Sequence, residues 1–256
     1  MNRIARAFQN ETAFIPFITA GDPNLEITEE LAVQMADAGA DLIELGVPFT
    51  DPVAEGIVIQ KADQRALEAG TTTDKLFDTV RRIRRRTDVP LVFMTYINPV
   101  YAYGAERFFE RCRDTGIDGI IVPDMPFDEK AEILDTCKAY GITLISMIAP
   151  TSRARIRCIS AEAEGFLYCV SSLGVTGVRS EITTDLGEMI REAKSVTDIP
   201  CAVGFGISTP EQARDIGREA DGVIVGSAIV RIIEEHGEAC VEPVVSYVQA
   251  MKAALE

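Results

Sequence analysis

Two acidic residues stand out in this sequence because of where they lie relative to an apolar run. Glu44 lies inside the run 41–45, and Glu55 follows in a segment bounded by Pro52 and Gly56. A carboxylate inside such a run either meets a structural partner in the core or faces an open end of the fold, where desolvation raises its pKa. We favour the second interpretation and take Glu44 as a candidate for acid–base chemistry. Glu55, considered alone, is typical of a solvated loop charge.

Two short glycine-bearing segments, 204–208 and 226–229, indicate a site for an anion such as phosphate. Glycine lets the backbone approach an anion closely, and the free N–H groups at the start of a helix then bind it through aligned dipoles. Neither segment contains Lys or Arg, so we expect backbone amides to hold most of the charge. A third glycine-bearing segment, 171–177, is a candidate loop to close over the ligand.

The elements that must position these residues follow from a repeated pattern. Between short apolar runs lie amphipathic segments, several of which open with Ser, Thr or Asp and end near Gly, as helices do. The eight runs that read as strands buried on both faces are residues 14–19, 41–45, 91–95, 119–122, 143–147, 165–170, 201–204 and 222–225.

Strict alternation of strands and helices produces a parallel sheet, and eight units in about 250 residues favour a closed barrel over an open doubly wound sheet. Further helices are predicted at residues 3–9 and 243–255. We therefore predict an α/β fold, a single (β/α)8 TIM-barrel domain over residues 1–256 with extra N-terminal and C-terminal helices. In this fold the active site forms from the loops after the strands, which places Glu44 and both glycine segments at one rim.

Missing residue types exclude several mechanisms. None of the six lysines follows a strand, so a Schiff base to a carbonyl substrate has no donor. The single histidine, His236, lies beyond the last strand, which leaves a histidine base or a histidine-bound zinc without support. No nucleotide-binding glycine motif is present. We expect no cofactor and no metal, with carboxylates performing the proton transfers.

Composition limits the classes of partner. The chain has 47% hydrophobic and 25% charged residues, as ordinary globular domains do. A net charge of -15 argues against nucleic acids and anionic membranes, which select basic surfaces. The arginines between positions 81 and 86 are interpreted as a solvated helix end.

We also find no pattern typical of a membrane span or of a secretory signal peptide. We find no apolar stretch of about 20 residues and no signal-peptide core at the N-terminus. The six cysteines are scattered, as expected of reduced thiols in the cytoplasm.

Seven motifs, taken in order, resemble the tryptophan synthase alpha chain family. They are PFITAGDP at 16–23, ELGVPFTDP at 44–52, YINP at 96–99, PDMP at 123–126, GVTG at 174–177, GFGIS at 204–208 and GSAI at 226–229. Each motif alone is unspecific, but together they cover the chain from about residue 13 to residue 233. The resemblance implies a cofactor-free lyase that splits indole-3-glycerol phosphate into indole and glyceraldehyde 3-phosphate in tryptophan biosynthesis. It also implies a beta chain that receives the indole, in an alpha2beta2 assembly.

The resemblance also implies roles for particular positions. Glu44 would be the acid–base residue at indole C3, and Glu55 would take the place of the carboxylate that accepts the indole N–H. The phosphate would be bound by Gly177, Gly206, Gly226 and Ser227, the substrate pocket would be lined by Phe17, Tyr96, Tyr168, Thr176 and Phe205, and positioning or contact with the partner would fall to Asp51, Asn98 and Asp124.

One segment departs from the family pattern. Where the family has Ala-Asp-Gly-Pro, this chain has Ala54-Glu55-Gly56-Ile57. The longer side chain displaces the carboxylate by roughly 1 Å, and a misplacement of that size can cost about 100-fold in rate. A catalytically weak paralogue that serves as an allosteric or structural partner of a beta chain is therefore one alternative. Another phosphate-binding barrel enzyme, such as a sugar-phosphate isomerase or aldolase, is a second alternative, since it would share the glycine loops.

Overall fold

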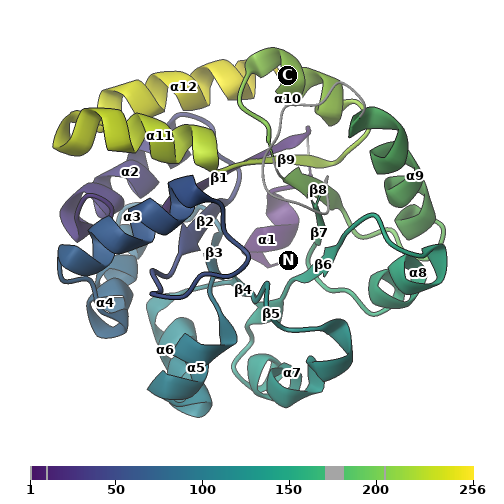
Figure 1. The fold of residues 1–256 in the computed structure, drawn as a ribbon, viewed down its shortest axis with the longest axis horizontal. Helices are drawn as coiled ribbons and strands as arrows, with labels where there is room; N and C mark the ends of the chain where they lie inside the picture. The colour runs from purple at the N-terminus through teal and green to yellow at the C-terminus, as the bar shows by residue number, and fades with distance from the viewer. Residues whose placement is uncertain (1, 10, 171–181, 205) are drawn as a thin grey trace.

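The computed structural model describes residues 2–9, 11–170, 182–204 and 206–256, and shows a ring of parallel strands enclosed by helices (Figure 1). The strands are β1 (Ala13–Thr19), β2 (Ile43–Gly46), β3 (Leu91–Met94), β4 (Gly119–Ile121), β5 (Thr143–Leu144), β6 (Ser146–Ile148), β7 (Leu167–Val170), β8 (Cys201–Gly204) and β9 (Gly222–Val225).

The described residues also form helices, of which α1 precedes the first strand and the others lie around the outside of the ring. They are α1 (Arg3–Arg6), α2 (Leu25–Asp37), α3 (Ile57–Glu68), α4 (Thr73–Arg84), α5 (Ile97–Tyr103), α6 (Ala105–Thr115), α7 (Ala131–Ala139), α8 (Arg153–Ala161), α9 (Ile182–Lys194), α10 (Pro210–Gly217), α11 (Ser227–His236) and α12 (Val241–Ala253), with short 3-10 turns at Phe127–Glu129 and Gly237–Ala239. None of these helices is long and apolar enough to cross a membrane in the described part of the chain.

The predicted barrel is confirmed, with one correction at the fifth strand. The hydrogen-bonded order is β5-β4-β3-β2-β1-β9-β8-β7-β6, and every pair is parallel. The predicted strand 143–147 is divided at Ile145, so β5 pairs with β4 and β6 pairs with β7. Because β5 and β6 are successive pieces of one strand, the covalent chain itself completes the ring at that point.

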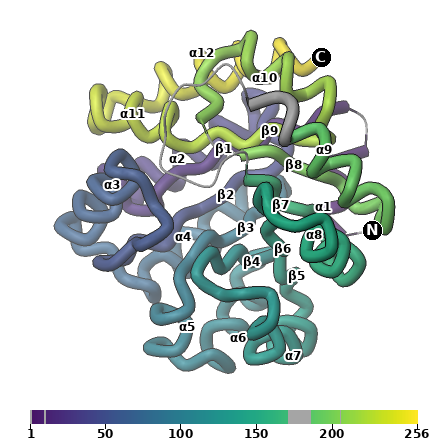
Figure 2. The backbone as a smooth tube through the Cα atoms, turned by 45° about the vertical axis from the view of Figure 1, so that its right-hand side comes forward, coloured from purple at the N-terminus to yellow at the C-terminus, as the bar shows by residue number. Residues whose placement is uncertain are grey.

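Helix α1 lies within the outline of the ring in Figure 1, where it closes the N-terminal end of the barrel. Its Ile4 packs into the interior cluster that also contains Val92 and Phe166, and the Phe8 ring lies 5.4 Å from the Phe166 ring. The helix is shorter than the predicted 3–9. At the other end of the chain, α12 lies beside α11 (Figure 2) and begins two residues earlier than the predicted 243.

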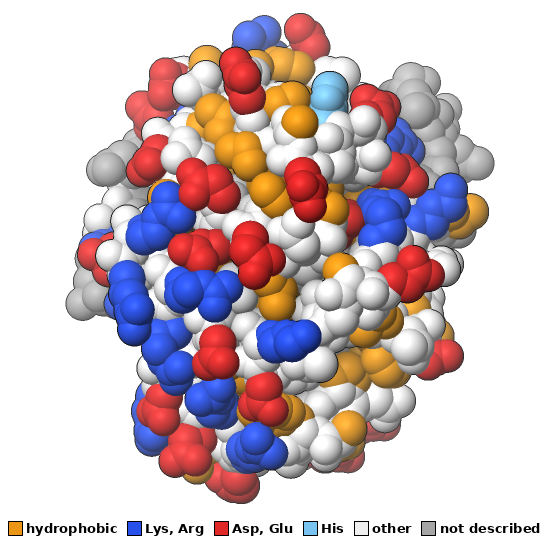
Figure 3. Space-filling model, turned by 90° about the vertical axis from the view of Figure 1, so that its left-hand side faces the viewer, with side chains coloured by type: hydrophobic (Ala, Val, Ile, Leu, Met, Phe, Trp, Pro, Cys, Tyr) orange, Lys and Arg blue, Asp and Glu red, His pale blue; other side chains and the backbone are white. Residues whose placement is uncertain are grey.

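Figure 3 shows a face of the molecule on which positive and negative side chains are mixed. Of the arginines between 81 and 86, Arg85 and Arg86 are exposed, and Arg81 and Arg82 are partly exposed. Arg82 and Arg86 pair with Glu29, at 2.6 and 3.4 Å. The interpretation as a solvated helix end is wrong for Arg84, whose side chain is only 10% exposed. The pattern of charges does not reveal this, because Arg84 turns away from solvent toward the start of the barrel strands.

Three aspartates tie the strands together at the N-terminal end of the barrel. Each stands just before one strand and accepts the backbone N–H at the start of the neighbouring strand: Asp41 from Phe14 (2.7 Å), Asp118 from Leu91 (2.9 Å) and Asp221 from Cys201 (2.7 Å). Each also binds a cation: Lys252 for Asp41 (2.9 Å), Arg84 for Asp118 (2.6 Å) and Lys194 for Asp221 (2.7 Å). We call these residues the strand-entry aspartates.

Asp118 is the least exposed of the strand-entry aspartates, with 11% of its side chain exposed. Burial lowers the pKa of the neighbouring Arg84 to about 10, and the negative charge of Asp118 partly offsets this shift. We expect Asp118→Ala to reduce the free energy of unfolding by about 3 kcal/mol, because it leaves a largely buried guanidinium without its carboxylate. Asp88→Ala is the matched control, because Asp88 is 82% exposed and lies 3.8 Å from Arg3. This variant should change the free energy of unfolding by less than about 0.5 kcal/mol. Urea unfolding of both variants measures the difference, and equal effects would contradict the assignment.

Candidate active site

Glu44 points into the barrel from the middle of β2. It lies in register with Phe17 of β1 and Val92 of β3, and its neighbours Ile43 and Leu45 face the surrounding helices. The side chain is fully buried, and neither carboxyl oxygen has a hydrogen-bond partner among the described residues. Burial, and then the charge of Glu55, raises the pKa of Glu44 well above its usual range. This shift favours the protonated form of Glu44, which is the form that could donate a proton.

Glu55 lies in the segment between β2 and α3 and is partly buried. Burial raises its pKa to about 7. The segment is tied to the barrel by the Ala54 N–H, which donates to the Tyr96 hydroxyl oxygen at 2.9 Å. The Gln60 side chain also donates to the Glu55 carbonyl at 2.8 Å. Both carboxyl groups thus have raised pKa values, and the charge of Glu55 acts on Glu44.

Two aromatic rings lie against glycines of the barrel strands. A Cβ on Gly46 would lie 2.6 Å from Cζ of Phe17, and a Cβ on Gly204 would lie 2.5 Å from the hydroxyl oxygen of Tyr168. Any larger residue at these positions would push the rings aside. Burial, and then the charges of Glu44 and Glu55, raises the pKa of Tyr168, so the charge of each carboxylate acts on this side chain.

The two predicted anion loops differ in how many backbone N–H groups are free at the start of the following helix. At the start of α10, side chains already accept these N–H groups, because Thr209 and Gln212 form a capping box and the Ser208 N–H donates to Gln212. The start of α11 has no side-chain cap after Gly226, which leaves the N–H groups of its first turn, beginning at Ser227, available to a ligand.

Gly226 also touches the pocket, because a Cβ there would lie 3.2 Å from Cδ1 of Phe17. Gly206 adopts φ +76 with open space around its Cα. Three further predicted residues, Thr176, Gly177 and Phe205, lie outside the described residues. The start of α11 is therefore the better supported anion site of the two.

The predicted positioning residues lie further out. Asp124, after β4, accepts the Ile97 N–H at 3.0 Å and so caps the start of α5. Asn98, in the first turn of the same helix, is exposed, as is Asp51, whose carboxylate accepts the Thr50 hydroxyl at 2.5 Å. Among the described residues, none of these three forms a hydrogen bond or an ion pair with Glu44 or Glu55.

One acidic residue of the site is missing from the sequence-based set. Asp63 lies on α3 with 5% of its surface exposed, and its pKa is raised to about 8 by burial and by the charge of Glu55. The sequence gives a weak signal, since an aspartate stands between Ala62 and Ala66 on an otherwise apolar face. Within the described part of the chain, no three His, Cys, Asp or Glu residues are grouped to hold a metal ion.

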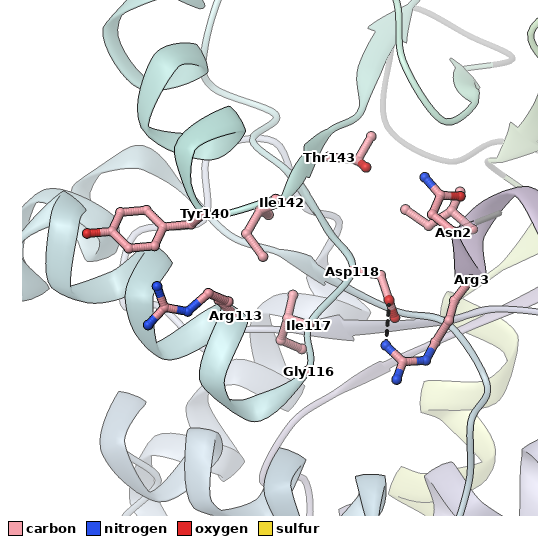
Figure 4. A pocket seen from close by; sticks show the side chains of 11 residues that line it. Asn2, Arg3, Arg113, Gly116, Ile117, Asp118, Tyr140, Ile142 and Thr143 are labelled. Atoms are coloured by element: carbon pink, nitrogen blue, oxygen red, sulfur yellow. Dashed lines mark hydrogen bonds and ion pairs between the residues drawn. The ribbon is translucent and has the colours of Figure 1, made fainter.

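A cavity of about 180 Å³ lies at the opposite end of the barrel (Figure 4). It is lined by residues near the starts of β4 and β5, including Arg3 and Asp118, which pair with each other at 3.1 Å. In this fold that end carries stability and the C-terminal rim carries chemistry. We therefore place the functional site at Glu44 and Glu55 and not in this cavity.

Comparison with known proteins agrees with this geometry. The family model of the tryptophan synthase alpha chain matches residues 4–256. The tryptophan synthase alpha chain of Caldanaerobacter subterraneus subsp. tengcongensis is 47% identical over 245 residues, which cover 94% of each chain. That of Lactiplantibacillus plantarum is 47% identical over 257 residues, covering 100% of this chain and 97% of its own.

Solved structures show the same similarity in three dimensions. The tryptophan synthase alpha subunit of Legionella pneumophila superposes with a TM-score of 0.90 at 35% identity, covering 100% of this chain and 98% of its own. A chain of the tryptophan synthase complex of Pyrococcus furiosus has a TM-score of 0.87 at 36% identity, covering 95% and 98%. This chain belongs to the tryptophan synthase alpha chain family.

Proposed function

We propose that Glu44 and Glu55 are the acid–base pair with which this chain cleaves indole-3-glycerol phosphate to indole and glyceraldehyde 3-phosphate. The chain is a carbon–carbon lyase of tryptophan biosynthesis, as its family membership establishes. The observation that carries the residue assignment is the fully buried Glu44 carboxyl, which has no hydrogen-bond partner in the described part of the chain and lies within the field of Glu55.

The reaction requires a net transfer of one proton from the glycerol hydroxyl to indole C3. Protonated Glu44 donates to C3, and the positive charge that develops on the ring nitrogen is stabilised by the Glu55 carboxylate at the N–H. The bond between C3 and the glycerol carbon then breaks, its electrons restore the aromatic ring, and the hydroxyl becomes the aldehyde. The released hydroxyl proton returns to Glu44, so the enzyme ends in its starting protonation state.

The remaining residues bind the two ends of the substrate. Gly226 and Ser227 at the start of α11, together with Gly206, hold the phosphate through backbone N–H groups. Phe17, Tyr96 and Tyr168 form the described part of the wall against the indole ring. This division places the flat apolar part of the substrate beside the carboxyl groups and its charge beside the helix dipole.

The chain works with a tryptophan synthase beta chain, and we propose an alpha2beta2 assembly in the cytoplasm, with residues 1–256 forming one domain. Val53 and Ile57, which flank Glu55, are 83% and 71% exposed. Apolar side chains that are exposed to this extent are typical of a surface that contacts a partner protein, which supports the proposed contact with the beta chain. Asp51 and Asn98, on the same rim, would supply polar contacts or help to position the loop, and Asp124 would hold α5 in place.

The role of Glu44 predicts the behaviour of Glu44→Gln. The amide has nearly the same shape and is always neutral, so the fold should retain its stability, whereas kcat should fall by about 100-fold or more because no acid remains at C3. Glu235→Gln, on the exposed face of α11, is the control and should leave kcat unchanged. The measurement is indole release by the purified chain with its beta chain, and undiminished turnover would exclude Glu44 as the acid.

The raised pKa of Glu55 predicts a pH dependence for both activity and stability. Because Glu55 acts as the ionised base, kcat/KM should rise with pH through about 7. The folded chain retains a proton that the unfolded chain has released, so the Glu55 contribution to stability should decline as pH rises from its ordinary value of 4.5 to about 7. A pH profile of kcat/KM tests the first statement, and a flat profile across this range would refute it.

Shortening the carboxylate arm tests whether the site is built around glutamate. The Tyr96 hydroxyl fixes the backbone at Ala54, so the loop cannot move freely to compensate. We expect Glu55→Asp to lower kcat by about 10-fold to 100-fold, since the carboxylate is withdrawn by about 1 Å from the indole nitrogen. A rise in kcat would instead show that glutamate impairs this chain, with Glu55→Gln serving as the control for loss of the charge.

A further inference from the structure

Two local hydrogen bonds hold the backbone on either side of Glu55. The Glu55 N–H donates to the Pro52 carbonyl at 3.1 Å, and the Gln60 side chain donates to the Glu55 carbonyl at 2.8 Å. Peptide groups are planar, so holding the groups on both sides of Glu55 restricts its two backbone torsions and therefore the direction of its side chain. We call residues 52–56 the Glu55 turn.

A third hydrogen bond joins the Glu55 turn to the barrel. The Ala54 N–H donates to the Tyr96 hydroxyl oxygen at 2.9 Å, across 42 positions of the chain. Tyr96 follows β3, and only 4% of its surface is exposed. Its ring lies 5.5 Å from the ring of Phe49, which precedes the turn. A ring packed in this way has few alternative positions, so its hydroxyl offers the turn a fixed point.

The backbone on both sides of Tyr96 is itself held by the next part of the barrel. The Thr95 N–H donates to the Ile121 carbonyl at 3.0 Å, and the Ile97 N–H donates to the Asp124 carboxylate at 3.0 Å. One acceptor belongs to β4 and the other to the loop that follows it. The position of the hydroxyl is therefore set by the barrel and not by the turn that it holds.

We propose that Tyr96 and Gln60 are positioning residues for the reaction: Tyr96 places the Glu55 turn against the barrel, and Gln60 orients Glu55 within it. This inference rests on the proposed function of Glu55. It gives the Tyr96 hydroxyl a role separate from that of its ring, which belongs to the pocket wall. Misplacement of a catalytic group by about 1 Å can lower a rate about 100-fold, so loss of either bond should lower kcat.

The effects on kcat and KM separate positioning from substrate binding. The Tyr96 ring and the phosphate contacts at the start of α11 contribute to KM, and Tyr96→Phe retains both. Gln60→Met keeps the length of the side chain and removes its N–H donors. Each variant should therefore lower kcat about 10-fold, with KM changed less than about threefold.

Each variant has a matched control, and all are measured in the alpha chain with its beta chain. Tyr140→Phe removes a hydroxyl that donates to Glu106 at 3.0 Å, beside the cavity at the opposite end of the barrel (Figure 4). Gln64→Met removes an amide that donates to Glu68 at 2.8 Å on the same helix as Gln60. Both controls should keep the kcat and KM of wild type.

Hydrogen exchange of the Glu55 turn reports its anchoring without any reaction. Tyr96→Phe leaves the Ala54 N–H without its acceptor, so the amides of the turn should exchange about 10-fold faster than in wild type. Gln60→Met releases the Glu55 carbonyl and should accelerate the same amides at least about threefold. The two controls should leave this exchange unchanged.

A double-mutant cycle shows whether the two residues act through Glu55. In a Glu55→Gln background the carboxylate is already absent, so adding Tyr96→Phe or Gln60→Met should lower kcat by less than about threefold further. A further 10-fold fall from either addition would overturn the proposal, because it would show a role that does not pass through the carboxylate.

Unchanged kcat or unchanged amide exchange in a folded Tyr96→Phe variant would also overturn the proposal. If that variant does not fold, Gln60→Met decides the matter by the same measurements, since Gln60 is exposed. Failure of the proposed function looks different. In that case Glu55→Gln leaves kcat unchanged or the wild-type chain releases no indole, while faster exchange of the Glu55 turn in Tyr96→Phe still reports the anchoring.

Discussion

The buried carboxyl group of Glu44, which has no hydrogen-bond partner among the described residues, is the constraint around which the site is built. A carboxylate in this position loses its hydration, and burial therefore raises the pKa of Glu44 and favours its neutral form. The rings of Phe17 and Tyr168 pack against glycines 46 and 204, where any larger residue would displace them. The same apolar wall that holds the proton on Glu44 is the surface suited to an indole ring, so binding and acidity have one physical cause.

Chemically similar groups acquire different roles here through their surroundings. Burial raises the pKa of Glu55 to about 7, and the charge of Glu55 in turn raises the pKa values of Glu44 and Asp63. In the proposed mechanism, this difference in surroundings separates the acid, Glu44, from the charged partner, Glu55.

Sequence patterns predicted the ring of strands well, and the bounds 201–204 and 222–225 coincide with β8 and β9. The break at Ile145 was not predictable, because the apolar run 143–147 continues through it. The two glycine loops looked equivalent, although Thr209 followed by Gln212 already indicates that α10 caps itself. Asp63 was missed because its burial and the effect of the Glu55 charge on its pKa arise from the tertiary fold, which periodicity along one helix does not encode.

The strand-entry aspartates have a consequence for how such a chain can diverge. They join neighbouring strands at the end of the barrel remote from the substrate, through backbone N–H groups that every sequence variant retains except proline. The contacts that stabilise the barrel are thereby separated in space from the loops that bind the ligand. A lineage can try new residues at the rim, as this chain has done with glutamate at position 55, without first losing the scaffold on which selection acts.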